Sequence, residues 1–190
     1  MLARLRADFA HELHFYRKFH RHPINWALHA VCVPLEWLSW LVVVVCMGVD
    51  HRLGLLGCVG GSLLAIALLG EEKAKSVPPI AVAASVFYAV LLLAGEFSAV
   101  VVGSVVGLYY LALRPSALHA VAALAQPLMG YGALLWVEDY GFVAAVAMHL
   151  GSWFLQVGVG HSMIEGNEPG MATALTLHAI ILSPLLAWLP

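Results

Sequence analysis

The stretch WALHAVCVPLEWLSWLVVVVCMG, residues 26–48, decides the fold class of this chain. Glu36 is its only Asp, Glu, Lys or Arg residue, and His29 is its only histidine. About 20 predominantly apolar residues are enough for an α-helix to cross the hydrocarbon core of a bilayer. The stretch is therefore predicted to be a membrane-spanning helix.

The rest of the chain has the same character. Of its 190 residues, 62% are hydrophobic and 11% are charged, far from the balance of a soluble domain. We predict one all-α domain over residues 1–190, a polytopic membrane bundle of six or seven transmembrane helices within 26–189. The further apolar stretches lie at 53–70, 79–95, 97–113, 116–137, 141–160 and 171–189.

Residues 1–22 have a different pattern, with polar and basic side chains between apolar ones at helical spacing. The apolar positions are Leu2, Leu5, Phe9, Leu13 and Tyr16. This pattern is typical of an amphipathic helix lying on a membrane surface. His22 and Pro23 should end that helix, and Asn25 is expected to cap the next one.

The basic residues predict an orientation. If the N-terminus is cytoplasmic, eight of the nine lysines and arginines fall on the inside, and only Arg52 falls outside. The composition favours a bacterial inner membrane, or the endoplasmic reticulum in a eukaryote. It offers no basic surface for nucleic acid. The lipid bilayer is the expected partner, and the oligomeric state is left open.

Two polar stripes run along predicted spans. Asn25, His29, Cys32 and Glu36 are spaced by 4, 3 and 4 residues and share one helix face. The second stripe leads to Glu165 and contains His149, Ser152 or Trp153, Gln156, Gly160 and His161. In the predicted topology, His20, His29 and His161 come to the same side of the membrane. Ionisable groups inside a membrane usually mark a functional site, and imidazole is the commonest protein ligand of metals.

The residues alone leave several functions open. The histidines could hold a non-haem metal, bind haem, form a metal or proton transport path, or only bond helices together. His149 and His161 are twelve residues apart, ~18 Å along an unbroken helix. Either the helix breaks near Gly158, or there are two metals, or His149 has another role. His178 is an alternative ligand.

Two motifs carry a family resemblance. The first is Tyr16-x3-His20-x4-Asn25-x3-His29-x4-Pro34. The second is His149-x3-Trp153-x2-Gln156-x3-Gly160-His161-x3-Glu165-x3-Pro169. In this order and spacing they resemble the signatures of the fungal 2-hydroxy-fatty-acid dioxygenase family. The resemblance covers the two ends of the chain, whereas residues 40–140 share only their apolar character with that family.

This resemblance implies an Fe(II)-dependent membrane dioxygenase with O2 as co-substrate. It would cleave a 2-hydroxy fatty acid between C1 and C2, giving a fatty acid one carbon shorter, as in fatty-acid α-oxidation. The implied metal ligands are His20, His29, His149 and His161. Glu165 and Tyr16 are the implied catalytic residues, and the implied residues around the metal and substrate are Asn25, Gln156, Trp153 and Glu36. After Glu165 the family usually has a basic residue, and Gly166 stands there instead, which leaves the substrate's head group open.

Overall fold

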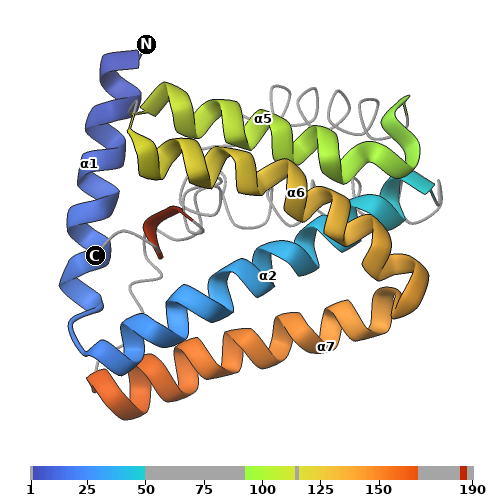
Figure 1. Cartoon of the computed structure of the whole chain (residues 1–190). Helices are drawn as coiled ribbons and strands as arrows, with labels where there is room; N and C mark the ends of the chain where they lie inside the picture. The colour runs from blue at the N-terminus through green and yellow to red at the C-terminus, as the bar shows by residue number, and fades with distance from the viewer. Residues whose placement is uncertain (1, 50–92, 114–115, 167–184, 188–190) are drawn as a thin grey trace, which may run out of the picture.

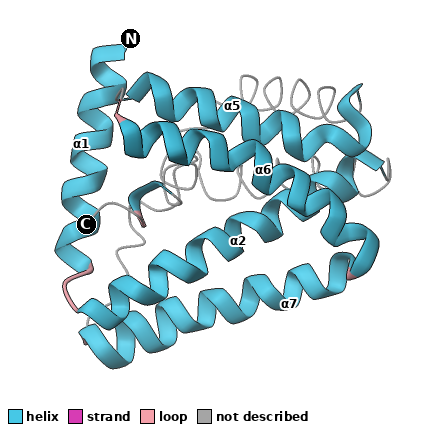
Figure 2. Ribbon diagram, in the orientation of Figure 1, coloured by secondary structure: helices cyan, strands magenta, loops and turns pink. Residues whose placement is uncertain are grey.

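The structure, a computed structural model, describes residues 2–49, 93–113, 116–166 and 185–187. All the regular elements in these ranges are helices (Figure 2). The predicted spans 53–70, most of 79–95 and most of 171–189 lie outside the described residues. The all-α prediction is confirmed for the part of the chain that is described.

Four described helices are long and apolar enough to cross a membrane. They are α2 (Pro23–Val49), the 3-10 turn η2 (Gly95–Phe97) with α5 (Ser98–Leu113), α6 (Ala117–Asp139), and α7 (Gly141–Phe154) with the π-helical segment η3 (Leu155–Glu165). The chain is therefore an integral membrane protein by the length and composition of its helices. The total of six or seven spans stays a prediction.

Helix α2 is the centre of the described bundle. It runs between the α5–α6 pair and α7 (Figure 1) and contacts all three helices. Its Leu41 and Val42 are fully buried, and Tyr110 of α5 is buried with them in the same core. Large apolar side chains such as Leu108 and Leu124 instead face outward, 68% and 69% exposed. An apolar exterior is what a surface in contact with lipid requires.

Helices α5 and α6 pack backbone against backbone. A Cβ added at Gly107 would lie against the carbonyl oxygen of Ala123, and one added at Gly130 would lie against that of Ala99. Small residues at such positions let membrane helices approach closely, so that dispersion contacts hold them together. The glycines therefore fix the separation of this pair.

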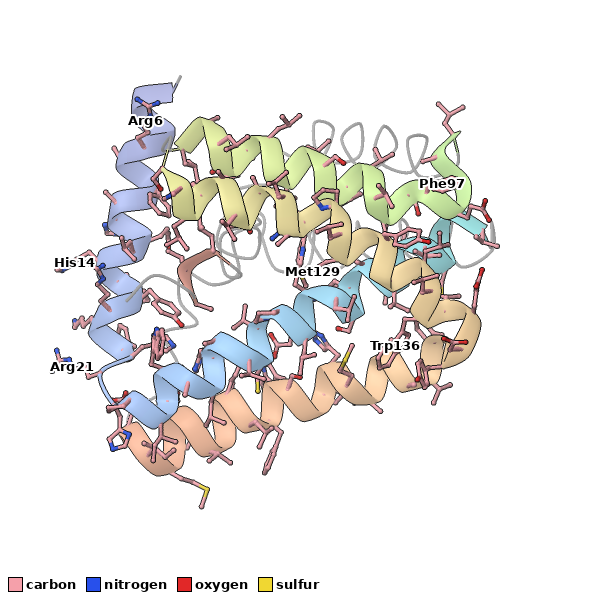
Figure 3. All side chains as sticks on the ribbon, in the orientation of Figure 1. Arg6, His14, Arg21, Phe97, Met129 and Trp136 are labelled. Atoms are coloured by element: carbon pink, nitrogen blue, oxygen red, sulfur yellow. The ribbon has the colours of Figure 1, made fainter. Side chains whose placement is uncertain are left out.

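Helix α1 (Leu2–Phe19) lies across one end of the bundle rather than along it (Figure 1). Its Phe9 is buried and contacts the ring of His119 of α6 edge-on, with centroids 5.7 Å apart. Arg6, near the upper end of α1 in Figure 3, donates to the carbonyl of Ala112 in α5 at 3.4 Å. The predicted helix is present, and its position on a membrane surface stays a prediction.

The chain turns sharply between α1 and α2. Helix α2 begins at Pro23, a residue favoured at the first helical position. His22 is the capping residue: its carbonyl accepts from the N–H of Trp26 at 3.0 Å, and its Nδ1 accepts from the N–H of Ile24 at 3.3 Å. The expectation that Asn25 caps α2 was wrong, because Asn25 lies inside the first turn and is fully buried.

Candidate metal centre

Three histidines from three separate elements meet at one end of the bundle. They are His20 after α1, His29 in α2 and His161 in η3. One nitrogen from each can be chosen so that all three lie within 4.8 Å of one another. The ring centroids are 4.2 Å apart for His20 and His29, 4.8 Å for His20 and His161, and 5.0 Å for His29 and His161. We call these residues the three-histidine group.

The fold explains why they meet. The end of α1, the start of α2 and the end of η3 lie at the same corner of the bundle (Figure 1). His29 follows Pro23 by six residues, ~9 Å along the helix axis. Beside His161, Gly160 has no side chain, and a Cβ there would lie against Oδ1 of Asn25. The close approach of η3 to α2 thus brings His161 to His29.

Hydrogen bonds orient two of the three rings. Nδ1 of His20 lies 2.6 Å from the carbonyl oxygen of Tyr16, and Nδ1 of His29 lies 2.9 Å from that of Asn25. A carbonyl oxygen can only accept, so both Nδ1 atoms carry the proton and both Nε2 atoms present a lone pair. Nε2 of His20 is buried and has no hydrogen-bond partner among the described residues. Metal-binding histidines characteristically have such a bond on the other ring nitrogen.

Burial also keeps His20 in the form that binds metals. Removal from water lowers the pKa of His20 from 6.5 to about 4, and the bond to Tyr16 only partly opposes this shift. His20 is therefore neutral at pH 7. Since a neutral imidazole is the form that coordinates a metal, the residues of this group fit a transition-metal ion.

Tyr16 lies against the group. Its ring stacks on His20, with centroids 3.7 Å apart and planes 13° from parallel, and meets His29 edge-on at 6.2 Å. Its hydroxyl oxygen is buried and has no partner among the described residues. Burial raises the pKa of Tyr16 further above its usual 10. The side chain therefore offers a neutral hydroxyl beside the histidines.

Glu165 and Asn25 lie beside the group without belonging to it. Glu165 Oε1 accepts from the backbone N–H groups of Arg21 and His22 at 2.8 and 2.6 Å. It also accepts from Nδ2 of Asn25 at 3.3 Å. Figure 3 shows Arg21 at the corner between α1 and α2. Glu165 thus contacts the chain on either side of Pro23, and it is not among the residues whose ligand atoms converge.

Glu36 and Gln156 form a separate contact between α2 and η3. Nε2 of Gln156 donates to Oε1 of Glu36 at 2.7 Å. Glu36 lies two turns beyond His29 along α2, ~10 Å away along the axis. The pair therefore joins the two helices deeper in the bundle than the three-histidine group.

The structure does not bring His149 and Trp153 to the group. Nδ1 of His149 is 3.0 Å from Oγ of Ser39, and its ring meets Trp40 edge-on. Ser39 lies ten residues beyond His29, ~15 Å along α2. Trp153 is 46% exposed, because its neighbour Ser152 occupies the inward position.

Of the three alternatives left open for His149, the helix break near Gly158 is not what the structure shows. The helix continues past that residue as the π-helical η3, so the twelve residues between His149 and His161 still separate them. The sequence reasoning missed Ser39 as the partner of His149. The signal was present, because Ser39 follows Glu36 by three residues and so lies on the same polar face of α2. His178, the alternative ligand, lies outside the described residues.

Comparison with known families agrees with the two end motifs. The model of the 2-hydroxy-palmitic acid dioxygenase Mpo1-like family matches residues 6–189, nearly the whole chain. The chain belongs to this family. The match to the 2-hydroxy-palmitic acid dioxygenase Mpo1-like family spans all three histidines of the group, and it confirms the resemblance drawn from the motifs. Searches of curated proteins and of solved structures gave no match.

Proposed function

We propose that this protein is an Fe(II)-dependent membrane dioxygenase that cleaves 2-hydroxy fatty acids between C1 and C2. The observation that carries the proposal is the three-histidine group. In His20 and His29, Nδ1 is hydrogen-bonded to a backbone carbonyl, which leaves the lone pair of Nε2 for a metal. The family match supports the substrate class. The membrane helices suit a substrate with a long alkyl chain.

His20, His29 and His161 are the proposed iron ligands. Fe(II) bound there would supply the activation of O2 and a binding site for the oxygens of the hydroxy acid. His149 is left out of the ligand set, because it is bonded to Ser39, which lies ~15 Å along α2 from His29.

The reaction balances without an external reductant. A 2-hydroxy acid, R–CH(OH)–COOH, and one O2 give R–COOH, CO2 and H2O. C2 is oxidised from the alcohol to the carboxylic acid level and C1 to CO2. Together they supply the four electrons that reduce O2. The bond that breaks joins C1 to C2. The protein therefore needs no flavin, nicotinamide or reductase partner for this reaction.

The chain's own residues would hold the head group at the end of the bundle. Tyr16 offers a buried hydroxyl without a partner among the described residues, and we assign it as a donor to the substrate carboxylate. The alkyl chain would follow the apolar helices into the bilayer. Asn25 orients His29 through its carbonyl. Glu36 and Gln156 bond α2 to η3 and so keep His29 and His161 on facing helices.

The alternatives fit this geometry less well. A haem between two axial histidines needs room for the macrocycle between their rings, whereas the rings of the group contact one another at 4.2 to 5.0 Å. Transport sites usually lie near the bilayer midplane. The three-histidine group is carried by the end of α1, the start of α2 and the end of η3, which meet at one end of the bundle (Figure 1).

Product analysis tests the proposed activity. Detergent-purified protein is loaded anaerobically with Fe(II), given 2-hydroxypalmitic acid and O2, and analysed by mass spectrometry for pentadecanoic acid and CO2. We expect both products from the wild type and from His14→Ala, an exposed histidine on α1 labelled in Figure 3. We expect neither from His29→Ala. Iron-loaded wild type that consumes no substrate would refute the proposal.

A further inference from the structure

We infer that Glu165 is a positioning residue for the metal centre, a latch that fixes the corner between α1 and α2 against the end of η3. This inference rests on the proposed metal centre. It gives Glu165 a different role from the catalytic one that the family resemblance implies.

Glu165 forms hydrogen bonds to the corner between α1 and α2. A single oxygen, Oε1, accepts from three donors: the N–H groups of Arg21 and His22 and Nδ2 of Asn25, at 2.8, 2.6 and 3.3 Å. These hydrogen bonds satisfy the backbone donors of the residues just before α2, which have no partner within that helix. Glu165, although it belongs to η3, therefore acts as a capping side chain for the start of α2.

These contacts lie close in sequence to the three histidines. Arg21 directly follows His20, and Asn25 precedes His29 by one turn. Glu165 itself follows His161 by four residues in η3. The contacts of one carboxylate thus reach the chain next to each of the three histidines. Loss of these contacts would free the corner that carries His20.

Asn25 extends the latch. Its Nδ2 lies within hydrogen-bonding distance of both Glu165 Oε1 and the carbonyl of Phe19, at 3.3 and 3.4 Å. Its own carbonyl orients His29. The backbone around His20 is thereby held on both sides, at Phe19 and at Arg21. A fully buried side chain with so many contacts has little freedom to move.

Glu165 is already engaged in hydrogen bonds away from the three-histidine group. Its Oε1 has three donors, and no carboxylate of the described residues joins the group whose ligand atoms converge. A ligand or a proton-transfer group would need its charge for the reaction. A latch needs only an oxygen acceptor at the same place.

That difference makes the glutamine variant decisive. Glu165→Gln keeps a side-chain oxygen of the same reach and removes the negative charge, whereas Glu165→Ala removes the acceptor. Binding of Co(II), a spectroscopic substitute for Fe(II), is titrated by visible absorption on the full-length protein in detergent without substrate or turnover. Glu138→Ala is the control, because Glu138 is an exposed glutamate at the end of α6, on the side of the bundle away from the three-histidine group.

We expect Glu165→Gln to bind Co(II) within about threefold of the wild type, with the same absorption band. Glu165→Ala should bind 10- to 100-fold more weakly, the usual loss when a group that orients metal ligands is removed. Its band should also shift, because His20 is no longer fixed. If the alanine variant does not give monodisperse protein, Glu165→Asp replaces it, since an acceptor one methylene shorter should give the same weakening.

Two results would overturn the latch alone. One is a glutamine variant as weak as the alanine variant, which would show that the charge of Glu165 acts on the metal. The other is a folded alanine variant that binds Co(II) like the wild type. Failure of the wild type to bind either Co(II) or Fe(II) would instead remove the metal centre itself, and the latch with it.

Discussion

At the scale of single residues, the site depends on which ring nitrogens are free. Tyr16 and Asn25 each supply a backbone carbonyl to the histidine four residues later, at 2.6 and 2.9 Å. A helix places residues i and i+4 on one face, so the same spacing that brings a ring into the site also provides its orienting bond. His149 has an equally good hydrogen bond to Ser39, and its position alone separates it from the group.

His149→Ala tests this separation. The change removes the bond to Ser39, so the free energy of unfolding should fall by about 1 kcal/mol. The iron content should not change, because sites well over ~10 Å apart usually act independently. Elemental analysis and thermal unfolding of the same preparation measure the two effects. Loss of iron from a folded His149→Ala protein would return His149 to the ligand set.

Tyr16→Phe tests the proposed contact with the substrate. A hydrogen bond to a charged group contributes about 1.5–3 kcal/mol, so its loss should lower kcat/KM roughly 10- to 100-fold. Iron stoichiometry should equal that of the wild type, since the stacked ring remains on His20. Steady-state O2 uptake with 2-hydroxypalmitic acid gives the comparison. Turnover equal to the wild type would exclude Tyr16 from the head-group site.

At the scale of helices, the close packing of α5 on α6 contributes to the stability of the bundle. Gly130 and Gly132 lie two residues apart on α6 but in opposite surroundings. A Cβ at Gly130 would lie against the backbone of Ala99, and one at Gly132 would meet nothing within 4 Å. The two glycines are therefore a matched pair.

Gly130→Ala should lower the free energy of unfolding by about 1–3 kcal/mol, because overpacking moves the backbones apart. Gly132→Ala should be neutral or add up to ~1 kcal/mol, since alanine is the better helix former. Thermal unfolding in one detergent ranks both against the wild type. Equal stability of the two variants would contradict the close approach of α5 and α6.

The sequence predicted the buried face of α2, but not the π-helical winding of η3 or the contacts of Glu165. The 4-3-4 spacing of Asn25, His29, Cys32 and Glu36 predicted a buried face of α2, and Asn25, His29 and Cys32 are indeed buried. The π-helical winding of η3 was not predictable, because no residue type specifies it by itself. The role of Glu165 depends on a bond to Arg21, 144 residues away, which no local pattern can reveal.

At the scale of the whole molecule, the three-histidine group and α1 lie at one end of the described bundle. Figure 1 shows the end of α1, the start of α2 and the end of η3 together, with the turn from α6 to α7 at the opposite end. The distribution of lysine and arginine predicts that the histidine end is cytoplasmic. A substrate head group would then enter from the cytoplasm.

Labelling of single cysteines with a membrane-impermeant maleimide tests this orientation in a bacterial expression host. Cys32, Cys46 and Cys58 are first replaced by alanine, and then His14→Cys or Tyr140→Cys is introduced. Both positions are exposed. Tyr140→Cys should label in intact cells, and His14→Cys only after permeabilisation. The reverse pattern would invert the topology, and labelling of both in intact cells would contradict their placement on opposite sides.

The most direct test of the metal centre is iron content with a visible spectrum, measured side by side on wild type, His161→Ala and His14→Ala purified anaerobically with Fe(II). We expect about one iron per chain in the wild type and in His14→Ala. We also expect no haem band, and loss of iron from His161→Ala. Wild type that holds no iron, or His161→Ala that holds as much as the wild type, would contradict the proposed metal centre.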